Sequence, residues 1–136
     1  MIFTGGPLLK KIINDTKAKA EDTLTPVGRK MFMYAGHDST ISNLLSALQV
    51  WDPQIPDYGI MILIELHHNK MGQHGIKVFL RNTTHHDPYP LTIPGCNTLC
   101  PLDQFIKLTD PVVPKDWEHS CEADDLDYTP PPAGPP

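Results

Sequence analysis

The chain has 136 residues, a length that suits one domain, with 40% hydrophobic residues and a formal net charge of −5 at pH 7. These values exclude a strongly basic nucleic-acid-binding protein, and they do not mark the chain as a whole as disordered. The longest uninterrupted apolar stretch, residues 60–64, is far shorter than the roughly 20 residues that span a bilayer, so we expect no membrane span in this chain.

The first predicted element is an amphipathic helix over residues 8–20. Its apolar side chains recur at helical spacing, at Leu8, Leu9, Ile12 and Ile13. Pro7 stands near the first turn, where a missing amide is harmless. Residues 21–28 include Thr, Pro and Gly and are predicted to connect this helix to the next element.

A short buried strand over residues 31–35 is predicted next, and it leads into the pair His37 and Asp38. Beyond the pair the period of the pattern changes, which predicts a second amphipathic helix. Its apolar side chains are Ile41, Leu44, Leu45 and Leu48. Either Ser39 or Thr40 is expected to cap this helix.

The pair His37 and Asp38 is the main candidate site, because the carboxyl end of a strand is where α/β proteins tend to place chemistry. The free backbone N–H groups at the start of the following helix favour an oxyanion such as phosphate. An imidazole and a carboxyl group beside that place indicate phosphoryl chemistry. His-Asp pairs are also common in ordinary loops, so a solvated helix cap is the alternative interpretation.

A β-hairpin is predicted after the second helix, which should end at the prolines of residues 53–56. Residues 59–68 form an isoleucine-rich strand, residues 69–75 a turn, and residues 76–81 an antiparallel return strand. Both faces of the first strand are largely apolar, so we expect a sheet covered on two sides. Glu65 is the exception and needs a partner or water.

The three cysteines and two glycosylation sequons bear on the compartment. Cys96 and Cys100 lie four residues apart in a loop bounded by Pro and Gly, which suits a local disulfide and leaves Cys121 unpaired. The sequons begin at Asn14 and Asn82. These features favour a secreted protein, although the amino terminus is not a secretory signal, so we expect a truncation at that end. The rival interpretation is a cytosolic protein with free thiols and unused sequons.

Negative charge is concentrated near the carboxyl end. Six of the 16 acidic residues and none of the 11 basic residues follow Lys115, so residues 1–115 carry 10 acidic and 11 basic side chains, a net +1. The last eight residues include five prolines, which cannot donate hydrogen bonds to a sheet. Residues 122–136 are therefore predicted to be an acidic, proline-rich disordered tail.

Seven histidines, four of them in adjacent pairs, raise the question of a metal site. Adjacent residues on a strand point to opposite faces, so neither His67-His68 nor His85-His86 can chelate through both members. The sequence has no HExxH or CxxC motif. We therefore expect no metal and no cofactor.

Several segments, in order, resemble the carboxyl-terminal third of the histidine acid phosphatases, the family of the prostatic and lysosomal acid phosphatases. They are residues 5–9 (GGPLL), 34–40 (YAGHDST), 81–91 (RNTTHHDPYPL), 94–96 (PGC), 100–102 (CPL) and 114–117 (PKDW), and Cys121. The resemblance implies a mixed-sheet α/β domain flanked by helices, of the phosphoglycerate mutase type. Residues 1–121 would form its carboxyl-terminal segment, incomplete without the amino-terminal part.

The resemblance also implies the chemistry of an acid phosphatase that hydrolyses phosphate monoesters through a phosphohistidine intermediate. His37 matches the histidine that contacts the phosphate, and Asp38 matches the general acid that protonates the leaving alkoxide. The nucleophile belongs to an Arg-His-Gly-x-Arg-x-Pro motif, and no Arg-His-Gly occurs in this sequence. We therefore expect negligible turnover from this chain alone. In a complete site we expect an acidic optimum, because Asp38 must be protonated to act as an acid.

Other properties implied by the resemblance are a disulfide between Cys121 and an upstream cysteine, small phosphomonoester substrates, and an ability of the full-length form to make homodimers. The location would be secreted or lysosomal, with the signal peptide lost together with the amino-terminal region. A strand carrying the nucleophile would complete the sheet, so the chain alone should expose apolar surface and be poorly soluble or partly molten. The alternative function is a noncatalytic secreted binding module or an inactive truncated product.

Overall fold

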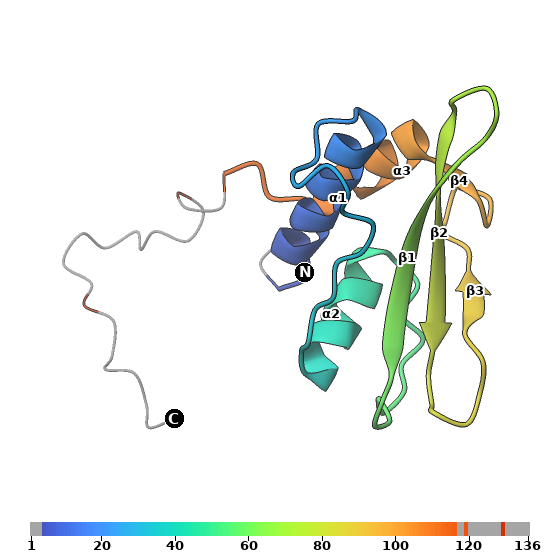
Figure 1. Ribbon diagram of the computed structural model, residues 1–136. Helices are drawn as coiled ribbons and strands as arrows, with labels where there is room; N and C mark the ends of the chain where they lie inside the picture. The colour runs from blue at the N-terminus through green and yellow to red at the C-terminus, as the bar shows by residue number, and fades with distance from the viewer. Residues whose placement is uncertain (1–3, 117–118, 120–128, 130–136) are drawn as a thin grey trace.

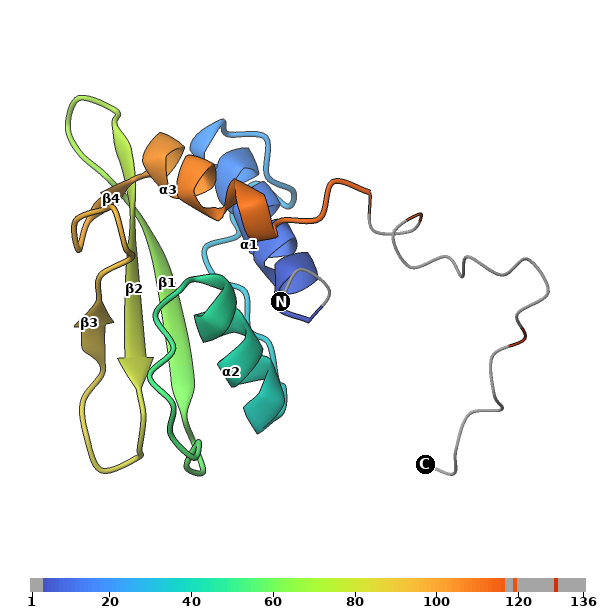
Figure 2. The ribbon, with the colours of Figure 1, turned by 180° about the vertical axis from the view of Figure 1, so that it is seen from behind.

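Helices lie on one side of an antiparallel sheet in the computed structural model of this chain, which describes residues 4–116, 119 and 129 (Figures 1 and 2). The elements are, in chain order, α1 (Gly6–Ala20), α2 (Asp38–Ala47), β1 (Met61–His68), β2 (His74–Arg81), β3 (Tyr89–Leu91), β4 (Cys100–Pro101), α3 (Leu102–Thr109) and the short 3-10 helix η1 (Asp110–Val112). This combination of helices and sheet confirms the predicted α/β class.

Strand β2 is central to the sheet. It pairs along its whole length with β1, from Met61 opposite Arg81 to His68 opposite His74, and its other edge pairs with β3 and β4. The predicted antiparallel hairpin is thus confirmed. Within the described residues β1 pairs with no strand other than β2, so the outer edge of β1 is open.

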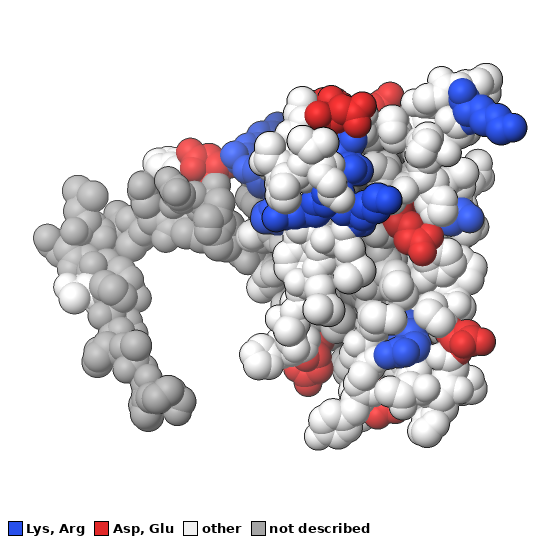
Figure 3. Space-filling view, viewed as in Figure 1, with Lys and Arg blue, Asp and Glu red and all other residues white. Residues whose placement is uncertain are grey.

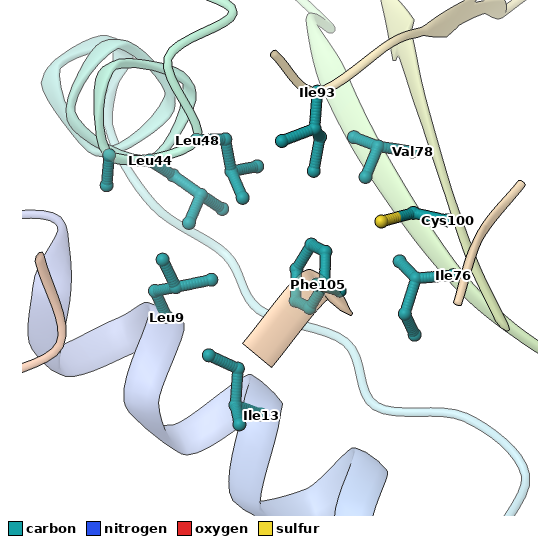
Figure 4. Close-up of a cluster of buried hydrophobic side chains, with 10 residues drawn as sticks. Leu9, Ile13, Leu44, Leu48, Ile76, Val78, Ile93, Cys100 and Phe105 are labelled. Atoms are coloured by element: carbon teal, nitrogen blue, oxygen red, sulfur yellow. The ribbon is translucent and has the colours of Figure 1, made fainter. Parts of the chain in front are cut away.

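The core fills the space between the helices and one face of the hairpin (Figure 4). The alternation of the strands aims β2 side chains at the helices, and α3 inserts Phe105 between the sheet and α1. The buried members are Leu9, Ile13, Leu44, Ala47, Leu48, Ile76, Val78, Ile93, Cys100 and Phe105. Burying these side chains is the main source of stability in this fold.

The opposite face of the hairpin carries no helix in the described part of the chain (Figure 1). Leu63, Glu65, Phe79 and Pro88 line a shallow hollow there. The expectation that both faces are covered is therefore wrong for these residues. An apolar pattern on two faces shows only that a strand suits burial on both sides, and it does not show which element covers each face.

The predicted strand over residues 31–35 is also wrong, because the chain there forms no strand. A strand needs a hydrogen-bonded neighbour, and β1 does not pair with this segment. Met31 and Met33 are 74% and 86% exposed. Phe32 packs against its surroundings, with Lys11 Nζ lying 5.4 Å and Arg29 Cζ 5.0 Å from the ring centroid.

Helix α3 and the short strands β3 and β4 were not predicted from the sequence. Residues 102–109 have apolar side chains at helical spacing, with Phe105 and Thr109 buried on one face. The neighbouring prolines and cysteines suggested a loop, and only eight residues carry the helical pattern. Such a short helix depends on tertiary packing more than on its own propensity.

The first and last described parts of the fold are tied together at α1. Lys10 Nζ donates hydrogen bonds to the carbonyl oxygens of Pro114 (2.6 Å) and Lys115 (3.1 Å). A Cβ added at Gly6 would lie 2.3 Å from the carbonyl oxygen of Val112. The end of η1 therefore crosses the start of α1 at a distance that only glycine permits.

Two further findings concern the predicted absence of a membrane span and the predicted carboxyl-terminal tail. No helix in the described part of the chain is long and apolar enough to span a membrane. Trp117, Cys121 and the predicted tail over residues 122–136, except Thr129, lie outside the described residues.

Gly5 controls how closely α1 approaches α2, and this contact generates a prediction. A Cβ at residue 5 would lie 2.3 Å from the Asn43 carbonyl oxygen, so Gly5→Ala must push the helices apart. We expect a cost of about 1–3 kcal/mol, which makes opening of α2 roughly 5- to 150-fold more frequent in hydrogen–deuterium exchange. Gly28→Ala is the control, because a Cβ there meets nothing within 4 Å. Equal exchange in both variants would contradict the prediction.

The exposed methionines generate a second prediction. The 136-residue chain should bind the dye ANS and unfold over a broad temperature range, because Met31 and Met33 leave apolar surface in water. Changing both to lysine should lower the ANS fluorescence by at least about twofold. Ile55→Lys serves as control, since Ile55 is 95% exposed elsewhere on the surface. A sharp, cooperative unfolding transition without dye binding would show that this expectation fails.

Candidate active site

His37 and Asp38 lie at the amino-terminal end of α2. His37 is the N-cap residue, with extended backbone (φ −101°, ψ 171°), and Asp38 is the first residue of the helix. Both side chains are exposed. The prediction that this pair lies at a junction leading into a helix is confirmed, although the segment before it is extended chain without strand pairing.

The predicted cap is wrong by two or three residues. Neither Ser39 nor Thr40 caps α2, because both fall within its first turn and His37 takes the N-cap position. Thr40 has a different role, since its Oγ1 accepts a hydrogen bond of 3.2 Å from the backbone N–H of His37. The N-cap residue depends on backbone dihedral angles, which the sequence does not reveal between neighbouring candidates.

Hydrogen bonds in the first turn of α2 orient the Asp38 carboxyl group. Asp38 Oδ1 accepts a 2.6 Å hydrogen bond from the backbone N–H of Ser39, while the hydroxyl of Ser42 donates to the Asp38 carbonyl oxygen at 2.9 Å. This geometry leaves Asp38 Oδ2 as the oxygen suited to carry a proton. The imidazole of His37 and a protonated carboxyl group can each donate a hydrogen bond to an oxyanion near the helix end.

The two arginines of the chain are engaged at other places. Arg29 lies over the ring of Phe32, and Arg81 Nη2 donates to the Gly59 carbonyl oxygen at 3.2 Å. Among the described residues no hydrogen bond or ion pair joins either arginine to His37 or Asp38. The pair alone therefore offers two polar side chains and the end of a helix, without an arginine clamp for phosphate.

Basic side chains gather instead over α1 and the loop that follows it (Figure 3). Lys11 lies there over Phe32 and donates a 2.6 Å hydrogen bond to the Asp15 carboxylate, which raises the pKa of the Lys11 ammonium group. The ring of Phe32 also stacks on Tyr34, with 6.5 Å between centroids. Through Phe32 these contacts attach the extended segment before His37 to Lys11 of α1.

The adjacent histidines on β1 point to opposite faces, as the strand period requires. His67 Nε2 lies 2.8 Å from Glu65 Oε2, which supplies the partner expected for Glu65, while His68 faces His74 across the hairpin at 6.0 Å between ring centroids. The residues that the structure describes contain no group of three or more His, Cys, Asp or Glu side chains placed to hold a metal ion.

Cys96 and Cys100 form the predicted disulfide, with 5.5 Å between their Cα atoms. Cys100 is buried in the core at 2% exposure and directly precedes α3, and the Gln104 side chain donates to the Gly95 carbonyl oxygen at 2.6 Å. The disulfide thus fixes the entry to α3.

The two predicted glycosylation sites differ in surroundings. Asn14 is exposed on α1, whereas Asn82 is half-buried directly after β2. Modification of both asparagines stays a prediction. Cys121, with its expected upstream partner, lies outside the described residues.

Comparisons with known proteins find a family whose model matches the part of the chain that contains His37 and Asp38. Residues 4–81 match the model of the histidine phosphatase superfamily (branch 2). The chain is 41% identical to human prostatic acid phosphatase over 117 residues, which cover 86% of this chain and 29% of that protein. It is 40% identical to mouse prostatic acid phosphatase over 119 residues, which cover 88% of this chain and 30% of that protein.

A third relative, bovine lysosomal acid phosphatase, is 37% identical over 118 residues, which cover 87% of this chain and 27% of that protein. The chain thus spans less than a third of the length of the curated relatives it matches.

The disulfide generates a prediction about α3. Replacing Cys96 and Cys100 with serine should destabilise the segment by about 2 kcal/mol, since the closed loop is short and its entropy gain modest. Hydrogen–deuterium exchange of residues 102–109 should therefore become faster. Cys121→Ser, which keeps this disulfide, should leave the exchange of α3 unchanged. Unaltered exchange in the double variant would show that the bond does not secure the helix.

Proposed function

Because this chain belongs to the histidine phosphatase superfamily (branch 2), we propose that it supplies one half of an acid phosphatase active site. The observation that carries the proposal is the exposed pair His37 and Asp38 at the start of α2, within the residues that match the family model. His37 contacts the phosphate of a small phosphomonoester, and Asp38 acts as the general acid.

The reaction proceeds in two steps. A histidine from another part of the enzyme attacks phosphorus, the bond between phosphorus and the ester oxygen breaks, and the leaving alkoxide takes the proton of Asp38. In the second step Asp38, now a carboxylate, accepts a proton from the water that attacks the phosphohistidine, which releases phosphate and restores both groups. The orientation of Asp38 supports this role, since Oδ1 is occupied by the Ser39 amide and Oδ2 is available for the proton.

The nucleophile and the arginine clamp come from residues that this sequence does not contain. No Arg-His-Gly motif occurs in the 136 residues, and Arg29 and Arg81 are engaged away from the pair. A general acid typically contributes about 10²- to 10⁴-fold in rate, whereas loss of the nucleophile closes the covalent route altogether. The chain alone is therefore expected to have negligible activity, and we expect the complete enzyme to work best in an acidic medium, because a general acid must carry a proton.

The proposed environment is secreted or lysosomal. One of the relatives is named a lysosomal acid phosphatase, and a disulfide such as Cys96–Cys100 is typical of proteins outside the reducing cytosol. We propose N-linked glycans at Asn14 and Asn82 because each begins a sequon, and a homodimer of the full-length form because of the family resemblance.

A noncatalytic binding module is the second candidate function. The observation that favours it is the extended segment before His37, where Met31 and Met33 present exposed apolar side chains. Such a surface suits a partner as well as the rest of an enzyme. The two functions differ in whether Asp38 matters to any reaction.

The test combines the 136-residue chain with the upstream portion of human prostatic acid phosphatase that the chain does not match, produced together in one cell. We expect the pair to hydrolyse an aryl phosphate at about pH 5, and neither component alone to do so. Asp38→Asn should lower kcat by about 10²- to 10⁴-fold because the leaving group loses its proton donor.

Asp103→Asn is the matched control, since Asp103 is an exposed acidic residue in the first turn of α3. It should leave kcat unchanged. Turnover that is absent from the combined components, or that is insensitive to Asp38→Asn, would contradict the enzyme and favour the binding module.

A further inference from the structure

We infer that Thr40 is a positioning residue for the pair His37 and Asp38, and that its hydroxyl group holds the backbone of His37 at the start of α2. Thr40 touches no substrate in this role and acts through His37. The role deepens the proposed function and rests on it, because it matters only if His37 and Asp38 take part in phosphate chemistry.

Thr40 bonds the backbone of His37 at both ends. Its Oγ1 accepts the His37 N–H at 3.2 Å, and its own backbone N–H donates to the His37 carbonyl oxygen at 3.0 Å. The N–H of Ile41 also donates to that carbonyl, at 3.3 Å. The carbonyl of His37 is thus held by the helix itself, whereas the N–H of His37 is held by the Thr40 side chain.

The Thr40 side chain is also wedged against Gly36. A Cβ built at Gly36 would lie 3.0 Å from Thr40 Oγ1 and 3.1 Å from both Cβ and Cγ2 of Thr40, so glycine leaves room for the threonine side chain there. Thr40 is half-buried, while His37, Asp38 and Ser39 before it are exposed. A β-branched side chain has few rotamers, which limits the positions that the hydroxyl can take.

The position matters because, among the described residues, the other contacts of the extended segment lie at least three residues before His37. Phe32 contacts Lys11 and Arg29, and the Tyr34 hydroxyl donates to Asp15 Oδ2 at 3.5 Å. The Thr40 hydroxyl therefore makes the side-chain hydrogen bond nearest to the pair on its amino-terminal side. A displacement of a catalytic group by about 1 Å can lower a rate by about 10²-fold, so loosening this link should reduce turnover.

Two substitutions at residue 40 separate the hydroxyl from the shape of the side chain. Thr40→Val keeps the branched shape and removes the oxygen that accepts the His37 N–H. Thr40→Ser keeps the oxygen and removes Cγ2. Thr16→Val is the control for loss of a helical threonine hydroxyl, since Thr16 Oγ1 donates to the Ile12 carbonyl oxygen within α1, at 2.7 Å.

The first readout is exchange of the His37 amide proton in the 136-residue chain. Thr40→Val should speed this exchange by about tenfold, the change that corresponds to one lost capping hydrogen bond, while Thr40→Ser and Thr16→Val should leave it within about twofold. The second readout is turnover of aryl phosphate by the chain combined with the upstream portion of human prostatic acid phosphatase. Thr40→Val should lower kcat by about five- to tenfold and change KM by less than about twofold, because the lost geometry acts on the transition state.

Rescue by Thr40→Ser in both readouts would support the role of the hydroxyl. The inference is overturned if the His37 amide exchanges equally in Thr40→Val and the unaltered chain, or if Thr16→Val lowers kcat as much as Thr40→Val does. Failure of the proposed function has a different signature, namely turnover that Asp38→Asn does not change. In that case the exchange of the His37 amide still decides whether Thr40 holds the backbone, but Thr40 then has no role in catalysis.

Discussion

Burial of one face of the β1–β2 hairpin beneath the helices is the constraint on which the structure depends. Phe105 from α3 and Leu9 from α1 meet the side chains of β2 in this layer, and α2 joins it through Leu44 and Leu48. The start of α2 is placed only because its own apolar stripe is anchored there. The position of His37 and Asp38 therefore follows from a core in which neither takes part.

The candidate site has well-defined geometry but, among the described residues, lacks an arginine that bonds to the pair. The Thr40 side chain and the Ser39 amide give the pair a defined backbone and a defined carboxyl orientation. In the described part of the chain no arginine bonds to the pair, and a group of basic side chains lies over α1 and the loop after it. A carboxyl group with a defined orientation but no arginine clamp beside it suits the proposed half of a shared site, which agrees with a chain that spans less than a third of its relatives.

What the sequence predicted well was whatever depends on local spacing. The apolar period of α1 and the alternation around residues 61–81 led to the right elements, and the separation of four positions between Cys96 and Cys100 led to the right disulfide. Residues 31–35 have the composition of a strand, but a strand exists only beside another strand, and that information lies outside the segment. Thr40 was expected as a cap because its residue type fits, whereas its contact with the His37 amide depends on where α2 begins.

The junction of Lys10 with the carbonyl oxygens of Pro114 and Lys115 bears on the order of events during synthesis. These partners are more than 100 residues apart, since the bond to Pro114 spans 104 positions. At a synthesis rate of about 5–20 residues per second, α1 leaves the ribosome several seconds before the segment that crosses it. By then α1 can already pack against α2 and β2 through Leu9 and Ile13, but its start stays uncovered until the crossing segment arrives. The carbonyl groups that Lys10 binds are thus among the last of the described fold to be made, and a delay in translation there prolongs the time for which the start of α1 stays uncovered.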